Sequence, residues 1–361
     1  MKYELPFNVP FSGFTTTDFI NCFAATVMVL EGRTGDDDYD CKQRNGEPCD
    51  GCGNCRGSTA GLQEHLFFLY DTMSGRSSLR CRWDGEPTEM QKLIGETEVD
   101  SCGTDYTVDF LFGFAGYAYD KLMAPDAFSA AITASVDAGR PVIAKVKSGE
   151  GRFRVITGYD GDALISPDYA NAQRRPQGAP AYDELDALYL IGDKGEPRYT
   201  LKDGLERIVT VMTYNLDEKL WDEYMDKMGW YQPDGLAQMD LEGKQARMKR
   251  VADTMWHTFN CHNCAEVFRY RTYEELQNPA LDDICKEIGG PCFGYTHDLA
   301  WALIGLNDRL DWTPYHNEYV CGWGEMVELT LDRIKQNDIQ ALNAIKRALA
   351  VCAFGEGLSG K

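Results

Sequence analysis

The residue whose surroundings best suit nucleophilic chemistry is Cys22. It stands near the start of the apolar run FINCFAATVMVL, and the polar residues at 15–18 predict a helix start just before it. Unpaired backbone N–H groups and the helix dipole stabilise an anion in an opening turn, so a thiol there is prepared as a thiolate nucleophile. The alternative reading is a small core residue beside Phe23, because free cysteine is among the most buried residue types.

A second group of thiols lies in CKQRNGEPCDGCGNC, inside a Cys-rich insertion at residues 36–57. Four thiolates complete a tetrahedral zinc shell, and closely spaced Cys-x2-Cys turns also suit an iron–sulfur cluster. The candidate ligands are Cys41, Cys49, Cys52 and Cys55. The sequence favours a metal without choosing zinc or iron–sulfur, and a loop without metal stays open.

The elements that must position these side chains change character near residue 215. Before it, turn signals separate short β-rich runs and a few helices. Beyond it, apolar residues recur at spacings of three and four residues, which is the period of a helix. This predicts an α+β fold with two domains, residues 1–215 and an all-helical domain over residues 216–361. One expected helix runs to Leu30 and is closed by Gly32, and another opens at Pro125 and ends at Gly139. Further helices are expected at residues 58–71, 244–270, 274–288, 296–306, 324–335 and 338–354. Strands are expected at residues 141–147, 152–160, 163–166 and 186–192, in one antiparallel sheet.

A helix that carries a cysteine, followed by an antiparallel sheet, is the layout of papain-like domains. The stretches NCFAATVMVLEG and GRPVIAKVKSGEGRFRVITGYDGDALISPDY resemble butirosin biosynthesis protein H and the cysteine peptidases that trim double-glycine leader peptides. The resemblance covers roughly residues 10 to 200. It implies a papain-like fold with Cys22 as the nucleophile, Asp168 as the acid that orients the base, and Gly158-Tyr159-Asp160 as the strand exit.

The chain departs from that family at the position of the base. The residue six before Gly158, where the imidazole belongs, is Arg152, and arginine cannot accept a proton in a protein. One explanation is an inactive site that binds a carboxylate or phosphate through Arg152 and Arg154. A second is a base supplied from elsewhere, by His65, His257, His262 or His297. A third is a slipped register, against which the lack of histidine between residues 66 and 256 argues. Tyr159 and His297 are further candidates for contacting a substrate.

A second likeness concerns uncharacterised bacterial proteins that join such a papain-like domain to a helical carboxy-terminal domain. The segments LYLIGDKGEPRYTLKDGLERIV at residues 188–209 and YTHDLAW at residues 295–301 carry it. It supports the division into two domains and implies no activity.

Composition limits the partners. The chain has 361 residues, with 36 Lys plus Arg against 57 Asp plus Glu and a net charge of −21, which repels nucleic acid and anionic membranes. We expect a cytoplasmic protein, because the amino terminus lacks the apolar core of a secretory signal and residues 22–30 are too short to span a membrane. Its 13 cysteines are then expected to be reduced.

The leading functional prediction is cysteine-dependent acyl transfer, or amide or ester hydrolysis, at Cys22 on a small molecule or peptide. The first alternative is a catalytically inactive papain-like protein that binds a small molecule. The second is a metal or iron–sulfur protein built on the loop from Cys41 to Cys55. The sequence does not determine the substrate or the oligomeric state.

Overall fold

The computed structural model describes residues 2–11, 18–38, 57–73, 97–99, 105–147, 153–167, 178–223, 240, 242, 287 and 317–351. The chain divides into two compact units. Unit 1 comprises Met1–Tyr70, Val99–Gly103 and Asp109–Tyr199, and unit 2 comprises Asp71–Glu98, Thr104–Val108 and Thr200–Lys361. Helices and antiparallel strands are both present, so the α+β class is confirmed.

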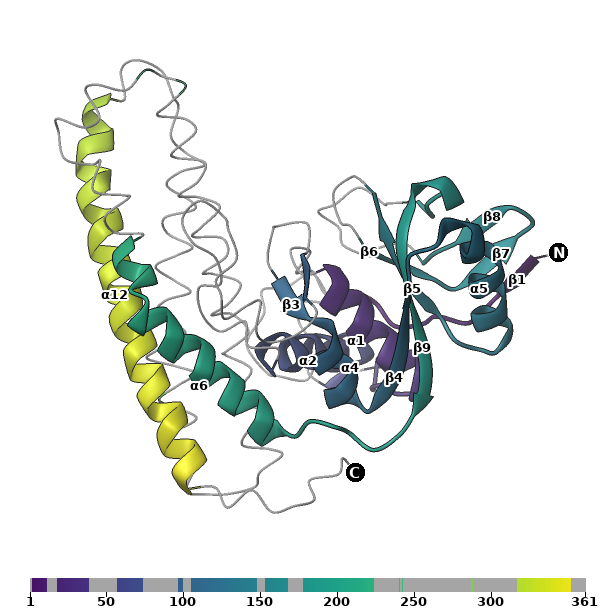
Figure 1. Ribbon diagram of the computed structural model, residues 1–361, viewed down its shortest axis with the longest axis horizontal. Helices are drawn as coiled ribbons and strands as arrows, with labels where there is room; N and C mark the ends of the chain where they lie inside the picture. Colours follow the sequence, from purple (N-terminus) through teal and green to yellow (C-terminus); the bar gives the residue numbers. More distant parts are fainter. Residues whose placement is uncertain are drawn as a thin grey trace. The chain divides into compact units, whose positions relative to one another are not determined.

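The main sheet of unit 1 has four antiparallel strands in the order β4-β9-β5-β6 (Figure 1). These strands are β4 (Tyr117–Leu122), β5 (Val142–Val146), β6 (Phe153–Ile156) and β9 (Leu185–Lys194). Strand β9 pairs with both β4 and β5, and five of its ten residues are buried. The predicted strands at residues 141–147 and 186–192 are therefore confirmed as members of one antiparallel sheet, in which β5 and β9 are neighbours.

A separate three-stranded sheet joins β1 (Lys2–Glu4), β7 (Gly158–Asp160) and β8 (Ala163–Ile165). The expectation of one sheet was wrong, because the predicted strand at residues 152–160 is interrupted at Thr157 and its second half pairs with β1 and β8. Gly158 allows this pairing: a Cβ there would lie 2.3 Å from the backbone oxygen of Tyr3. Two short strands, β2 (Thr97–Val99) and β3 (Asp105–Thr107), form a further pair.

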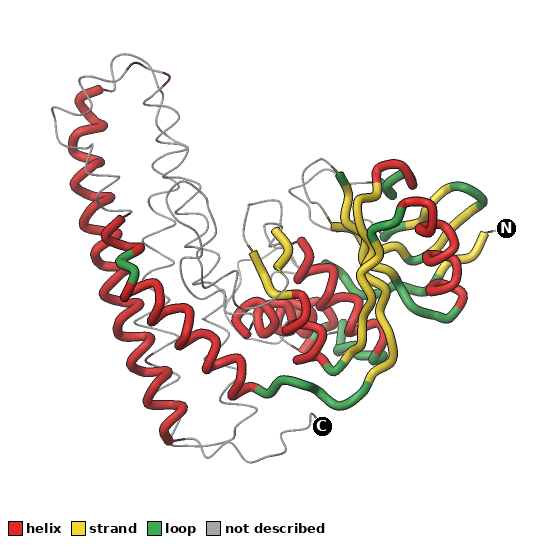
Figure 2. Tube along the Cα trace, in the orientation of Figure 1, coloured by secondary structure: helices red, strands yellow, loops and turns green. Residues whose placement is uncertain are grey.

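Helices cover both faces of the main sheet (Figure 2). Helix α5 (Pro125–Asp137) packs Phe128, Ile132 and Val136 against the face that carries Val142 and Ala144. It begins with proline at its first turn and is followed by Gly139 at φ +80, as its sequence predicts.

Helix α1 (Asp18–Leu30) packs against the other face. The ring of Phe19 meets Phe153 and Tyr189 edge-on, with centroids 5.1 and 5.2 Å apart. Phe23 contacts Tyr70 of α2 (Thr59–Met73) and Phe112 of α4 (Val108–Ala115) in the same manner. These aromatic contacts fix the rotation of α1 and hence the direction of every other side chain on it.

In unit 2, helix α6 (Leu201–Asp217) starts at a capping box in which Thr200 accepts from the backbone N–H of Asp203. Residue 215, where the sequence periodicity changes, lies inside α6. Helix α12 (Asn317–Val351) is continuous, so the two helices predicted over residues 324–335 and 338–354 are one. The buried Trp221 indole donates to Asp338 of α12 at 3.2 Å.

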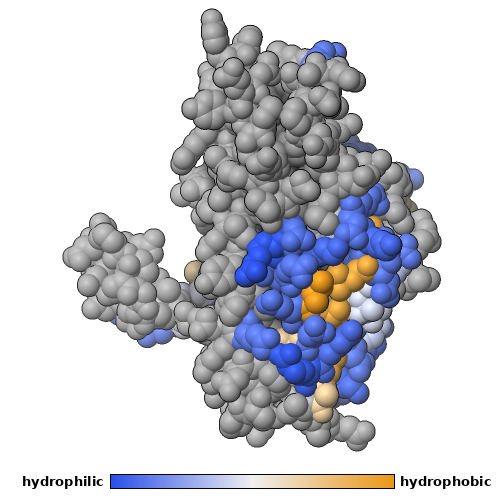
Figure 3. Space-filling model, turned by 90° about the vertical axis from the view of Figure 1, so that its left-hand side faces the viewer, coloured by the Kyte–Doolittle hydropathy of each residue, from blue (hydrophilic) through white to orange (hydrophobic). Residues whose placement is uncertain are grey.

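Among the residues coloured in Figure 3, hydrophilic residues surround a smaller apolar area. Among the described residues, no helix is both long and apolar enough to cross a membrane. The helices predicted at residues 244–270, 274–288 and 296–306 lie outside the described residues.

Candidate functional site

Cys22 is the fifth residue of α1, one turn after Phe19, and its side chain is completely buried. It is not in a disulfide. Because Phe19 faces the sheet, the helical spacing of three directs Cys22 toward the same side of α1. The thiol therefore lies within the core of unit 1 and has no exposed surface.

Buried polar side chains flank Cys22 along α1. The Gln63 amide nitrogen donates to the side-chain oxygen of Asn21 at 2.8 Å, and both residues are fully buried. Among the described residues, the side-chain oxygens of Gln63 and Thr26 have no hydrogen-bond partner. An unpaired buried polar group costs free energy, so these positions are unusual for a purely structural core. Sequence reasoning missed them, because Gln63 stands beside Glu64 and His65 in the sequence and nothing local marks it as buried.

Arg154 lies on β6 and is 7% exposed. It pairs across the strands with Ala144, whose side chain belongs to the core beneath α5. Phe153, its neighbour, contacts Phe19 of α1 instead. Since adjacent residues of a strand point to opposite faces, Arg154 leaves the sheet on the face opposite α1 and Cys22. Its guanidinium donates to the backbone oxygen of Phe153 at 2.7 Å.

Tyr159 lies on β7, and its hydroxyl donates to Asp137 at the end of α5 at 2.7 Å. This hydrogen bond raises the pKa of Tyr159 above its ordinary value of 10.0. Its ring also lies near Tyr3, with centroids 6.4 Å apart. The Tyr159 side chain, which the sequence suggested as a substrate contact, therefore links β7 to α5 through this hydrogen bond.

The other candidates lie outside the described residues: Arg152, Asp168, His297, Cys41, Cys49, Cys52 and Cys55. Of the four histidines considered as a base, His65 on α2 is described, and the other three are not. Within the described ranges, no cluster of three or more His, Cys, Asp or Glu has the arrangement of a metal site.

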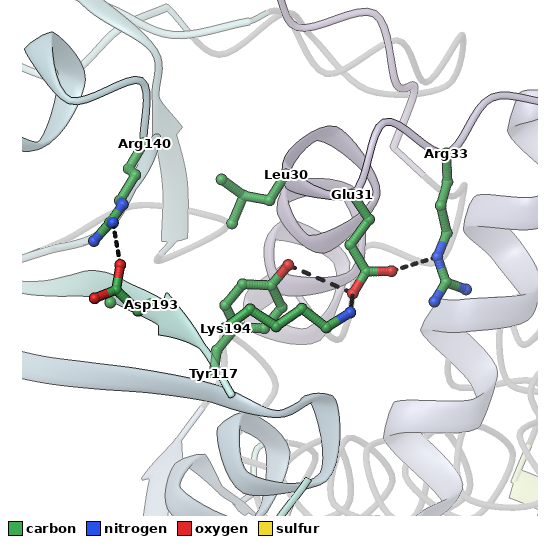
Figure 4. A pocket seen from close by; sticks show the side chains of 8 residues that line it. Leu30, Glu31, Arg33, Tyr117, Arg140, Asp193 and Lys194 are labelled. Carbon is green, nitrogen blue, oxygen red and sulfur yellow. Dashed lines mark hydrogen bonds and ion pairs between the residues drawn. The ribbon is translucent and has the colours of Figure 1, made fainter. Parts of the chain in front are cut away.

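An open pocket of about 460 Å³ lies at the carboxyl end of α1 (Figure 4). Four segments far apart in the sequence meet there: the end of α1, the start of β4, the turn after α5 and the end of β9. Its lining residues are Leu30, Glu31, Arg33, Tyr117, Arg140, Gly192, Asp193 and Lys194.

Glu31 is the centre of one side of this pocket. Its carboxylate pairs with both Arg33 and Lys194 and accepts a hydrogen bond from the Tyr117 hydroxyl at 3.4 Å (Figure 4). The Glu31 side chain is only 10% exposed, whereas the two cations are each 48% exposed. Burial, and then the charge of Glu31, raise the pKa of Tyr117 far above its ordinary value. The Lys194 ammonium also lies over the Tyr117 ring, 5.6 Å from its centroid.

On the other side of the pocket Arg140 pairs with Asp193 (Figure 4). Asp193 is 87% exposed and Arg140 is 36% exposed, so water screens this pair. The lining therefore carries three cationic side chains and two carboxylates. Sequence reasoning did not find this group, because its members come from separate elements and form no local motif.

Comparisons with protein-family models, with curated proteins and with solved structures found no match for this chain.

Proposed function

We propose that the protein binds a small molecule in unit 1 and does not use Cys22 as a nucleophile. The observation that carries this proposal is an open pocket at one end of α1, while the thiol on the same helix is fully buried. A nucleophile must come within about 3–3.5 Å of the carbonyl carbon that it attacks. A thiol without exposed surface offers no such approach, whereas the pocket is accessible as it stands.

The proposal keeps the papain-like scaffold for the amino-terminal domain and an all-helical carboxy-terminal domain. The packing of α1 across β5 and β6 supports the first, and the helical course of α12 supports the second. The sequence adds that Arg152 stands where the base of such an enzyme belongs. A domain without a base at that position keeps the fold and loses the reaction.

The second candidate function is cysteine-dependent acyl transfer, or amide or ester hydrolysis, at Cys22. It is favoured by the buried amide pair that Gln63 forms with Asn21, the residue before Cys22 on α1, because an unpartnered amide oxygen is a polar group that the core does not require. In that function Asp168 orients the base, and the substrate is a small molecule or peptide. This candidate requires the thiol to become accessible.

The metal proposal for Cys41, Cys49, Cys52 and Cys55 is independent of both functions. Zinc or an iron–sulfur cluster there would stabilise the insertion at residues 36–57. Metal analysis of protein purified without oxygen tests it: a stoichiometry near one metal site per chain supports the proposal, and one near zero removes it. A reducing, cytoplasmic location belongs to the same proposal, because these thiolates must stay reduced.

Thiol labelling separates the binding function from the catalytic one. The native full-length chain is treated with iodoacetamide at neutral pH, and modification is read peptide by peptide. We expect Cys22 to stay unmodified in the native protein and to react in denaturant. Selective, rapid modification of Cys22 in the native protein would overturn the binding proposal in favour of catalysis. The Cys22→Ser variant provides the control for assignment of the peptide.

A further inference from the structure

We infer that the pocket at the end of α1 binds an oxyanion, either a carboxylate or a phosphate group of a small molecule. This inference rests on the proposed binding function and names the ligand class of that site. Its first support is charge: the described residues of the lining include one more cation than carboxylates, in a chain whose net charge is −21. A locally positive cavity on an acidic protein is a place where anions concentrate.

The second support is the supply of hydrogen-bond donors. Arg33 engages Glu31 through Nε, and Arg140 engages Asp193 through one terminal nitrogen. Within the described part of the chain, neither guanidinium makes another hydrogen bond with a side chain or the backbone. Each guanidinium has five N–H donors in a planar fork that matches carboxylate and phosphate oxygens. Both arginines thus keep donors for a ligand.

The third support is the way in which Glu31 holds its partners. Its nearly buried carboxylate is already occupied by Arg33, Lys194 and Tyr117, so it offers little to a cationic ligand. Instead it orients two cations at the pocket wall, which lowers the entropy cost of ordering them around a ligand. Glu31 is a positioning residue here, because it acts through Arg33 and Lys194.

Other ligand classes fit less well. Among the described residues of the lining, Leu30 is the only aliphatic side chain larger than alanine, so an apolar ligand would gain little buried apolar contact. A cationic ligand would have to displace Arg33 or Lys194 from Glu31. Asp193 is the more accessible carboxylate, but its high exposure makes it a weak partner.

Titration of the full-length chain tests the inference. Inorganic phosphate and succinate are titrated separately by calorimetry, with sodium chloride used to hold ionic strength constant. The variants are Arg33→Gln and Arg140→Gln. The matched control is Arg198→Gln, which also removes an arginine paired with a carboxylate in unit 1, that of Asp109, but lies outside the pocket.

We expect saturable binding of at least one anion by the wild type and by the control variant. Each pocket variant should bind about tenfold more weakly or worse, because it loses a charge-assisted hydrogen bond. Binding of phosphate alone or of succinate alone identifies which oxyanion the pocket takes. Far-ultraviolet circular dichroism checks that each variant is folded. A variant that does not fold is replaced by Arg33→Lys or Arg140→Lys, which keeps the positive charge but removes the planar guanidinium that can donate two parallel hydrogen bonds.

The inference fails if neither anion binds saturably, or if both pocket variants bind as the wild type does. These outcomes differ from failure of the proposed function. If Cys22 is unreactive and no anion binds, the ligand class is wrong. If Cys22 reacts rapidly, the non-catalytic function is wrong whatever the anion titrations show.

Discussion

The substitution Glu31→Gln tests whether the pocket wall is a stable, preformed part of unit 1. Glutamine keeps the size of the side chain and can still accept from Tyr117, but it removes the negative charge between Arg33 and Lys194. The two cations then repel each other across a neutral amide. The contact also links the end of α1 to β4 and β9, so its loss should loosen this corner of unit 1.

The magnitude follows from the exposure of the partners. Exposed ion pairs contribute about 0.2–1 kcal/mol each, and hydrogen bonds to charged groups in buried settings about 1.5–3 kcal/mol. Glu31 is 10% exposed but each cation is 48% exposed, so each pair should lie near the top of the exposed range. We expect Glu31→Gln to lower the free energy of unfolding of unit 1 by about 2 kcal/mol at low salt. The loss should shrink as sodium chloride is added, because salt screens half-exposed charges.

Native-state hydrogen exchange is the suitable assay. All seven tryptophans fall within the residue ranges of unit 2, so tryptophan fluorescence does not report on unit 1. Amide exchange in β4 and β9 measures the opening free energy of unit 1 directly. The control is Glu4→Gln, which breaks the ion pair with Lys2 between side chains that are 47% and 60% exposed. We expect that control to cost less than about 0.5 kcal/mol. The reasoning is refuted if Glu31→Gln costs no more than Glu4→Gln.

Three further substitutions test separate parts of the molecule. Burial raises the pKa of Glu64 above 4.5, so folding makes ionisation of this carboxyl less favourable. Glu64→Gln should therefore raise the free energy of unfolding at pH 7. The gain should vanish below about pH 4, where the carboxyl is protonated in both states, and unfolding measured across pH checks this. Gly158→Ala should destabilise unit 1 by about 1–3 kcal/mol, because the added Cβ would lie 2.3 Å from the Tyr3 backbone oxygen. The control in the same exchange assay is Gly178→Ala, whose added Cβ would have no atom within 4 Å and should leave the stability unchanged. Thr200→Ala removes the cap of α6 and should cost about 1 kcal/mol in urea unfolding followed by tryptophan fluorescence, and an unchanged midpoint would count against the cap.

The sequence predicted the elements whose signals are local. The end of α1 follows from Gly32 at φ +61, and the start of α5 follows from Pro125. It missed β4, because YAYDKL mixes charged and aromatic residues without a clear alternation. It also placed a helix break inside α12, where Asn337 and Asp338 are instead buried, with Asp338 accepting from Trp221. That hydrogen bond joins residues 117 positions apart, so no local pattern reports it.

For the candidate site, the amino-acid sequence by itself determined that Cys22 lies on an apolar helix of an α+β domain, because caps and periodicity act within a few residues. Only the tertiary structure decided that this thiol is fully buried and that Arg154 leaves the sheet on the opposite face, because both depend on which strand face packs against α1. The pocket also depends on tertiary structure, because its lining residues come from separate elements. Glu31 and Lys194 are 163 positions apart, and they meet only because β9 pairs with β4 beside the end of α1.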